Sequence, residues 1–226
     1  MIDKFVPDIA AAIKGIADDS VIMIGGFGAI GSPNALIDGL LDLNLKGLTI
    51  VANNAGAAFG GLPKLMQAGA IRKVVCSYPK GAEKSVFVEL YRDGKIELEL
   101  VPQGTLAERI RAAGAGIPAF FTPTGAGTLL TQNRETRVIN GRLCVLEDAL
   151  FADAALLEAW QADRWGNLTY RLAGRNFNPV MAGAAKLTIV QTQHKVALGE
   201  LEPDQIITPG VFINRVVHVP YGDPQI

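Results

Sequence analysis

The sequence predicts an α/β fold of three layers, in which a mostly parallel β-sheet carries helices on both faces and has added β-hairpins. Short apolar segments rich in Val, Ile and Leu alternate with segments whose apolar residues recur every three or four positions. Later in the chain, Asn140 and Gly141 separate two β-prone segments, a pair typical of a tight hairpin turn. No linker or internal repeat divides the 226 residues, so we expect a single domain over residues 1–226.

Strands and helices alternate through the first half of the sequence. Phe5, Ile9 and Ile13 recur at helical spacing, which predicts a first helix that ends near Asp18. This alternation indicates parallel strands joined by helices. The strands expected next are Val21–Ile24, Leu48–Val51, Ile71–Cys76 and Ile96–Val101, and the helices between them begin at Pro33 or cover Leu62–Ala68 and Ser85–Asp93.

A capping box predicts where the following helix begins. Thr105 and Glu108 have the T-x-x-E spacing in which the two side chains cap the first turn, so the helix should start at Thr105. The elements expected after it are a strand at Ile117–Phe121, the hairpin Thr136–Ile139 with Arg142–Leu146, strands at Ala154–Trp160 and Leu168–Tyr170, a helix over Phe177–Ala185, a strand at Leu187–Val190 and an extended tail from Pro209 to Val219.

Composition narrows the classes of partner. Lys plus Arg is 21 against 22 acidic residues, so we expect neither a nucleic-acid partner nor a membrane surface. The longest uncharged segment, residues 112–133, contains four glycines and two prolines and is unsuited to a membrane-spanning helix. Two histidines and two widely separated cysteines, Cys76 and Cys144, predict no metal site and a reducing, cytoplasmic location.

The segment from Val21 to Pro33 carries the strongest functional signal. Four apolar residues predict a strand, four glycines follow within seven positions, and Ser32 can cap a helix whose first residue is Pro33. Glycines let the backbone approach a ligand closely, and the start of a helix presents free N–H groups with a positive dipole. A plain tight turn that packs the helix against the sheet is the alternative explanation.

The same segment contains a literal G-x-G-x-x-G from Gly26 to Gly31, which invites a dinucleotide-binding interpretation. That motif needs an acidic residue at the end of the second strand, where this sequence has Ala52, Asn53 and Asn54. The expected helix also begins after the third glycine. An NAD-binding oxidoreductase is therefore a distant alternative.

Three loops rich in glycine or amide side chains each follow an expected strand: Gly25–Gly31, Asn53–Gly56 and Gln103-Gly104. Because parallel strands end at the same edge of a sheet, these loops can meet in one crevice. They offer many hydrogen-bond donors but no nucleophile, general base or metal ligand. This pattern favours half of an active site over a complete one, with a non-catalytic module that binds sugar phosphates as a further alternative.

Several of these segments, in order along the chain, resemble the small A subunit of family I CoA-transferases. The similarity runs from about residue 4 to 219 and is carried by Asp19–Pro33, Asn53–Gly56, Val101–Arg111 and Arg175–Pro179. Within the family, Asp163–Tyr170, Gly199–Pro203, Ile207–Gly210 and Gln191 are similar to the branch that acts on 3-oxoadipate. Many relatives that act on other 3-oxo acids, such as acetoacetate, have Glu where this chain has Gln191.

The resemblance implies a reaction and a partner. CoA would move from succinyl-CoA to a 3-oxo acid, here 3-oxoadipate of the β-ketoadipate pathway for aromatic compounds. The family uses a ping-pong mechanism through a glutamyl-CoA thioester, and the nucleophilic glutamate belongs to a B subunit. We therefore expect a heterodimer or an A2B2 heterotetramer, with CoA esters as substrates and no permanently bound cofactor.

The resemblance also implies site residues in this chain. Gln103 would donate a hydrogen bond to the oxyanion of the reacting carbonyl, unless it is only a helix-entry residue bonded to backbone. Arg109 and Arg111 could meet the CoA phosphates, although a solvated helix face is the favoured interpretation. The residues expected to bind CoA or substrate are Gly25, Gly26, Phe27, Gly28, Ala29, Ile30, Gly31, Asn53 and Asn54.

Overall fold

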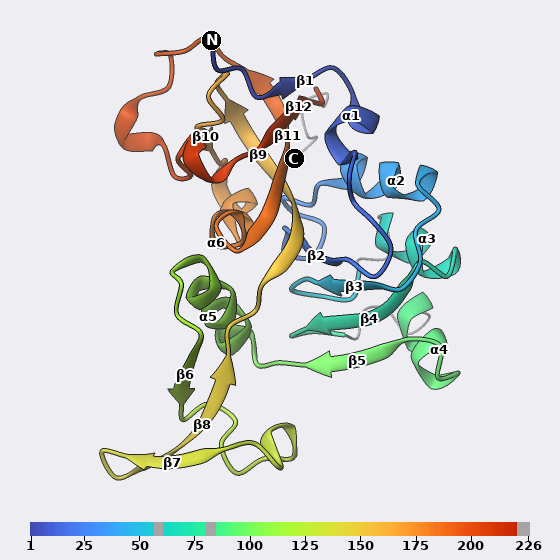
Figure 1. The fold of residues 1–226 in the computed structure, drawn as a ribbon, viewed down its shortest axis with the longest axis vertical. Coiled ribbons are helices and arrows are strands. Elements are labelled where there is room, and N and C mark those ends of the chain that lie inside the picture. Colours follow the sequence, from blue (N-terminus) through green and yellow to red (C-terminus); the bar gives the residue numbers. More distant parts are fainter. Residues whose placement is uncertain (57–60, 80–84, 221–226) are drawn as a thin grey trace.

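A mostly parallel β-sheet forms the centre of the protein in the computed structural model, which describes residues 1–56, 61–79 and 85–220 (Figure 1). Every neighbouring pair along the main path of this sheet is parallel, and the added strand β10 (Leu168–Thr169) pairs antiparallel with β9 (Ala152–Ala162). The α/β class is therefore confirmed. In spatial order the main path is β1 (Phe5–Val6), β12 (Arg215–His218), β11 (Ala185–Lys195), β9 (Ala152–Ala162), β2 (Val21–Ile24), β3 (Leu48–Val51), β4 (Ile71–Cys76) and β5 (Glu97–Leu100).

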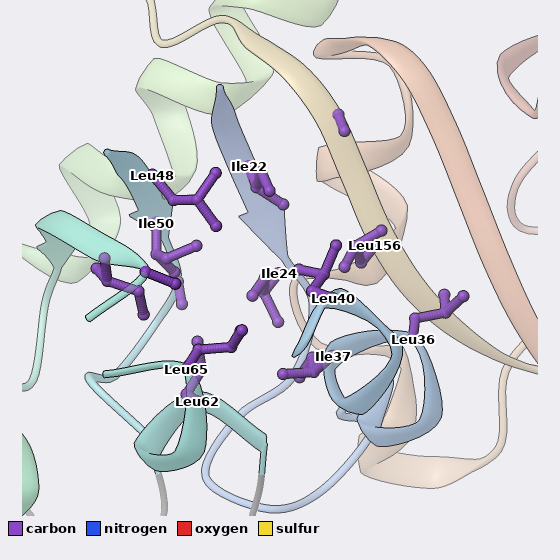
Figure 2. Close-up of a cluster of buried hydrophobic side chains, with 14 of the residues drawn as sticks. Ile22, Ile24, Leu36, Ile37, Leu40, Leu48, Ile50, Leu62, Leu65 and Leu156 are labelled. Atoms are coloured by element: carbon purple, nitrogen blue, oxygen red, sulfur yellow. The ribbon is translucent and has the colours of Figure 1, made fainter. Parts of the chain in front are cut away.

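Helices cover both faces of this sheet and bury a separate hydrophobic core on each. Ile22 and Ile24 of β2 point into one core and Met23 into the other, because successive side chains of a strand face opposite sides. Figure 2 shows Ile22 and Ile24 packed near side chains from the two helices that follow. The first core is covered by α1 (Ile9–Ile13), α2 (Asn34–Asp42), α3 (Gly61–Gln67) and α4 (Val86–Arg92), and the second by α5 (Gln103–Gly114) and α6 (Asn178–Ala182).

A smaller antiparallel sheet extends from the body beyond α5 (Figure 1). Its strands lie in the order β6 (Ala119–Thr122), β8 (Arg142–Asp148) and β7 (Thr136–Ile139). The turn between β7 and β8 has Asn140 at φ 50° and Gly141 at φ 75°, as the two-residue hairpin turn requires. The expected hairpin is confirmed, and the strand expected near Ile117–Phe121 belongs to this smaller sheet.

The first expected helix was partly wrong. Phe5 and Val6 form strand β1, which pairs with Val216 and Val217 of β12. Pro7 disfavours the helical conformation for the residue before it, so Val6 favours an extended conformation. The helix α1 begins only after Asp8, whose carboxylate accepts a hydrogen bond of 2.7 Å from the Ala11 N–H.

The expected helix over Phe177–Ala185 is also shorter than the pattern indicated. Helix α6 ends at Ala182, and strand β11 then runs for 11 residues. β11 pairs along its length with β9, also 11 residues long, and with β12 near its middle. Pairing on both sides therefore extends this strand beyond the Leu187–Val190 segment that the local sequence predicts. None of the helices in the described ranges has the length and apolar character needed to cross a bilayer.

Candidate active site

The glycine segment after β2 folds into a small hairpin at the carboxyl edge of the sheet. The Phe27 N–H donates to Ile30 O at 3.0 Å, and the Ile30 N–H donates back to Phe27 O at 3.2 Å. Gly28 and Ala29 form the exposed tip, and Gly28 has φ 64°, a conformation that glycine adopts without strain. Within the described chain, the N–H groups of Gly28 and Ala29 donate to no acceptor. This glycine hairpin, residues 25–31, therefore presents free backbone donors at its tip.

Two asparagines bind the glycine hairpin from behind. Asn176 Oδ1 accepts from the Gly26 N–H at 3.0 Å, and Asn176 Nδ2 donates to Ile30 O at 3.1 Å. Asn178 is completely buried, and its Nδ2 donates to Gly31 O at 3.0 Å. These bonds connect both arms of the hairpin to Asn176, which precedes α6, and to Asn178, the first residue of α6. The sequence reasoning missed these roles, and the paired asparagines within Arg175–Pro179 are the signal that indicates them.

The glycines of the hairpin are needed for different reasons. A Cβ on Gly25 would lie 1.9 Å from Asn178 Oδ1, and one on Gly31 would lie 2.6 Å from Gly174 O. A Cβ on Gly28 would have nothing within 4 Å. Gly25 and Gly31 therefore make room for the protein's own polar groups, whereas Gly28 borders open space. Packing within the protein therefore accounts for Gly25 and Gly31, and the positive φ of Gly28 accounts for glycine at the tip.

Replacing Gly25 by Ala should lower the free energy of unfolding by about 1–3 kcal/mol, the usual cost of overpacking. The new methyl group must displace Asn178, which is bonded to the hairpin. Urea denaturation of both proteins measures the difference. Gly104→Ala is the matched control, because its Cβ meets nothing within 4 Å and its φ is not positive. We expect that control to be neutral or slightly stabilising. Equal unfolding midpoints for the two variants would contradict the steric argument.

The start of α2 differs from the expected cap. The helix begins at Asn34, one residue later than expected, and the Ser32 hydroxyl bonds the Asn34 side chain at 3.1 Å instead of a helix N–H. The Leu36 N–H of the first turn donates to Gln191 Oε1 at 3.2 Å. Gln191 lies on β11, 155 positions away. The helix is thus capped by a long-range contact, because Ser32 is turned toward its neighbour.

The first hollow lies between the glycine hairpin and the loop that follows β3. Gly25, Gly26, Gly28 and Ala29 line one side, and Asn53 and Asn54 line the other. Ile30 and Gly31 instead border a second hollow, and Phe27 borders neither and is half exposed. None of the described residues that line the first hollow is acidic.

Gln103 is connected to this hollow through Asn53. Its Nε2 donates to Asn53 Oδ1 at 2.7 Å, and the Ser77 hydroxyl donates to the same oxygen at 2.9 Å. Asn53 is buried and lines the first hollow, and both donors engage its amide oxygen. All three donor loops thus lie at one edge of the sheet. Gln103 is therefore bonded to a side chain. The alternative explanation, a helix-entry residue, expected a bond to the backbone.

Helix α5 does not start at the expected capping box. It begins at Gln103, because the Leu106 N–H already donates to Pro102 O at 2.8 Å. The Thr105 hydroxyl is buried with no hydrogen-bond partner in the described chain, and Glu108 pairs with Arg111 at 2.6 Å. Gln103 therefore lies in the first helical turn, where free N–H groups favour a negative charge.

Arg109 was expected on a solvated helix face or near phosphates, and this was wrong. Its side chain is buried, its Nη1 donates to Glu99 Oε1 at 2.8 Å, and its Nε donates to Asp148 O at 2.8 Å. Arg109 thus joins α5 to β5 and to β8. Arg111, two positions on, is exposed as expected.

The second hollow, of about 530 Å³, lies on the other side of the glycine hairpin, where β9 ends. Glu158 of β9 accepts from Gln191 Nε2 at 3.2 Å and from Gln193 Nε2 at 2.9 Å. Burial raises the pKa of Glu158 above its ordinary value, and the two amide hydrogen bonds offset only part of this. The sequence reasoning did not anticipate this hollow. Its other lining residues include Ile30, Trp160, Tyr170, Arg171 and Leu172.

The described residues contain no group of three or more His, Cys, Asp or Glu side chains that could hold a metal ion. At this edge the described residues offer hydrogen-bond donation from backbone and amide groups, and a buried carboxyl faces the second hollow.

The chain is similar to known proteins over almost its whole length. Residues 6–219 match the family model described as Coenzyme A transferase. The A subunit of a 3-oxoadipate CoA-transferase from Pseudomonas putida is 59% identical over 97% of this chain and 95% of its own. A protein of the same name from Acinetobacter baylyi is 53% identical over 97% and 96%.

Solved structures share the fold. A crystal structure of an acyl-CoA transferase from Escherichia coli O157:H7, in a thioester complex with CoA, superposes with a TM-score of 0.85 at 22% identity. The match covers 99% of this chain and 50% of that chain, so this chain spans about half the length of that transferase. At this identity the likeness supports the fold alone.

Proposed function

This chain belongs to the coenzyme A transferase family, and from this premise we propose that it is the A subunit of a transferase that moves CoA from succinyl-CoA to 3-oxoadipate. The identity of 59% over nearly the full length of the Pseudomonas putida 3-oxoadipate CoA-transferase chain carries the choice of substrate. The first hollow supports the assignment of the nucleophile to a B subunit. It offers hydrogen-bond donors, and none of the described residues that line it is acidic.

The proposed reaction is covalent catalysis by a glutamate of the B subunit. The carboxylate attacks the acyl carbon of succinyl-CoA, and the CoA thiolate leaves to give a succinyl-glutamyl anhydride. The thiolate then attacks the glutamyl carbonyl, which releases succinate and leaves a glutamyl-CoA thioester. The second acid reverses the sequence, so its own CoA thioester forms and the glutamate is restored.

This chain would supply the donors for those steps. Each acyl transfer passes through a tetrahedral oxyanion, which preorganised N–H groups stabilise. Gln103 and Asn53 lie together beside the first hollow, and the tip of the glycine hairpin adds the free N–H groups of Gly28 and Ala29. We propose that the hairpin and Asn54 bind the CoA thioester while Gln103 donates to the oxyanion. No permanently bound cofactor takes part in this scheme.

Reconstitution with a B subunit tests the proposal. The chain alone should be inactive, and the mixture, as a heterodimer or an A2B2 heterotetramer, should exchange CoA. Borohydride added after succinyl-CoA should reduce the glutamyl-CoA thioester and inactivate the complex. Mass spectrometry should then find the reduced glutamate in the B subunit. Full transferase activity from this chain alone would contradict the division of labour.

Acetoacetate is the alternative acceptor. Assaying both acids against succinyl-CoA decides between them, and we expect kcat/KM to be higher for 3-oxoadipate. A titration with NADH serves as the control for the dinucleotide alternative, for which we expect no saturable binding.

A further inference from the structure

The second hollow has the properties of a small-molecule subsite. Its volume of about 530 Å³ lies within the usual range for ligand pockets of roughly 300–1,000 Å³. Apolar walls from Ile30, Trp160 and Leu172 surround a few polar groups, which is the usual composition of such pockets. It also lies at the carboxyl end of a parallel strand, where α/β proteins bind ligands.

The two hollows are neighbours, separated by the glycine hairpin. Ala29, Ser32 and Asn34 line both of them. A molecule whose reacting carbonyl lies at the first hollow can therefore extend its far end past Ala29 and Ser32 into the second. In the proposed function that molecule is an acyl-CoA, and its acyl chain extends from the reacting carbon on the side opposite to the CoA sulfur.

Arg171 is the cation of the second hollow. Its guanidinium lies 5.1 Å from the centre of the Trp160 ring, which orients it without neutralising its charge. No carboxylate of the described chain lies within 4.0 Å of Arg171, and its side chain donates no hydrogen bond to the described residues. Trp160 is in turn supported by His194, whose ring centre lies 4.2 Å away. A guanidinium that is held over an aromatic ring and keeps free N–H donors can bind a carboxylate with two hydrogen bonds.

Glu158 is the acidic group that faces the same hollow. Both of its carboxyl oxygens are occupied, by Gln191 and by Gln193, so they are turned toward β11. Burial also favours its uncharged form relative to a carboxylate in water. The oxygens of Glu158 are therefore engaged by amide donors, whereas the donors of Arg171 have no acceptor among the described residues. The remaining titratable group of the hollow, Tyr170, bonds Thr208 at 2.7 Å.

We propose that the second hollow receives the far end of a dicarboxylic acyl group and that Arg171 binds its free carboxylate. The proposal rests on the proposed function, in which both succinyl-CoA and 3-oxoadipate carry such a carboxylate. Acetoacetate lacks one. Arg171 thereby makes the enzyme select dicarboxylic over monocarboxylic acids.

The test compares acids in the reconstituted complex. Arg171→Gln should lower the ratio of kcat/KM for 3-oxoadipate to that for acetoacetate about 10- to 100-fold, as expected for loss of a charged hydrogen bond. The kcat/KM for succinyl-CoA should fall similarly. Arg171→Lys keeps the charge without the planar fork and should recover part of the ratio.

Arg137→Gln is the matched control. Arg137 also lies over an aromatic ring, that of Phe121 at 4.7 Å, but it belongs to the smaller sheet. Its substitution should leave the ratio unchanged. An unchanged ratio in Arg171→Gln would overturn the proposal, whether kcat/KM stays at the wild-type value or falls equally with both acids. An equal fall would indicate a general structural effect. If the wild type failed to use 3-oxoadipate, the proposed acceptor would be wrong, and the succinyl-CoA measurement would still test Arg171.

Discussion

Replacing Arg109 by Met is expected to lower the free energy of unfolding by about 3 kcal/mol, because it breaks a buried ion-pair network. Arg109 Nη1 lies 2.8 Å from Glu99 Oε1, and its Nε lies 3.7 Å from Glu147 Oε2. Loss of Arg109 leaves each carboxylate with one other cation, Lys73 for Glu99 and Arg134 for Glu147. These remaining pairs place the expected cost at the lower end of the range for buried pairs.

The measurement is thermal unfolding of the two proteins, in which about 3 kcal/mol corresponds to a fall in Tm of roughly 6–12 °C for a chain of this size. Arg111→Met is the control on the same helix. Arg111 is exposed and pairs only with Glu108, so its Tm should stay close to that of the wild type. A similar Tm for both variants would show that the network does not stabilise the fold.

The network also predicts a dependence on pH. Burial alone would raise the pKa of Glu99, but hydrogen bonds from Arg109 and Lys73 outweigh burial and hold that pKa below the ordinary value of 4.5. The ionised Glu99 therefore stabilises the fold above about pH 4.5, and this contribution is lost as the pH falls through the lowered pKa. In Arg109→Met, we expect the Glu99 contribution at neutral pH to be smaller, so acidification should remove less stability.

Replacing Gln103 by Ala in the assembled enzyme is expected to lower kcat about 100- to 1,000-fold, as loss of one oxyanion donor does elsewhere. One N–H of its amide is used by Asn53, which fixes the orientation of the group. The other N–H has no acceptor among the described residues, so in the proposed function it can donate to the oxyanion. Steady-state kinetics with succinyl-CoA and 3-oxoadipate measure the effect, and kcat should fall much more than KM rises.

Two further variants distinguish the loss of the hydrogen bond that Gln103 donates from a change in the size of its side chain. Gln103→Glu keeps the size of the side chain but cannot donate when ionised, so it should be as impaired as the Ala variant. Gln67→Ala, at an exposed glutamine of α3, should behave as the wild type. Near-normal turnover by Gln103→Ala would reject the role of Gln103 as an oxyanion donor.

Local patterns predicted the elements whose ends depend on nearby residues. Apolar segments identified β2, β3 and β4, and the Asn140-Gly141 pair identified the hairpin of the smaller sheet. The same patterns were wrong where a distant strand competes. Phe5 has helical spacing with Ile9 and Ile13, but pairing with β12, more than 200 positions away, makes Phe5 and Val6 a strand.

In the candidate site, too, local patterns predicted some features and contacts between distant elements decided others. The sequence placed the glycine segment, Asn53 and Gln103 after strands, which is sufficient to expect them at one edge of a parallel sheet. It did not show that Gly25 is needed because Asn178 packs against it. Neither the cap on α2 from Gln191 nor the burial of Arg109 leaves a mark in local spacing, because their partners belong to other elements of the fold.

By itself the sequence therefore determined the fold class, the family and the donor-rich, nucleophile-poor character of the glycine hairpin and its neighbouring loops. Only the tertiary structure decided which glycines make room for protein atoms, how the hairpin separates two hollows and where Arg171 lies relative to them. The physical reason is that periodicity records which face of an element is buried. The identity of the groups that meet across that face depends on strand order and register, which no local pattern contains.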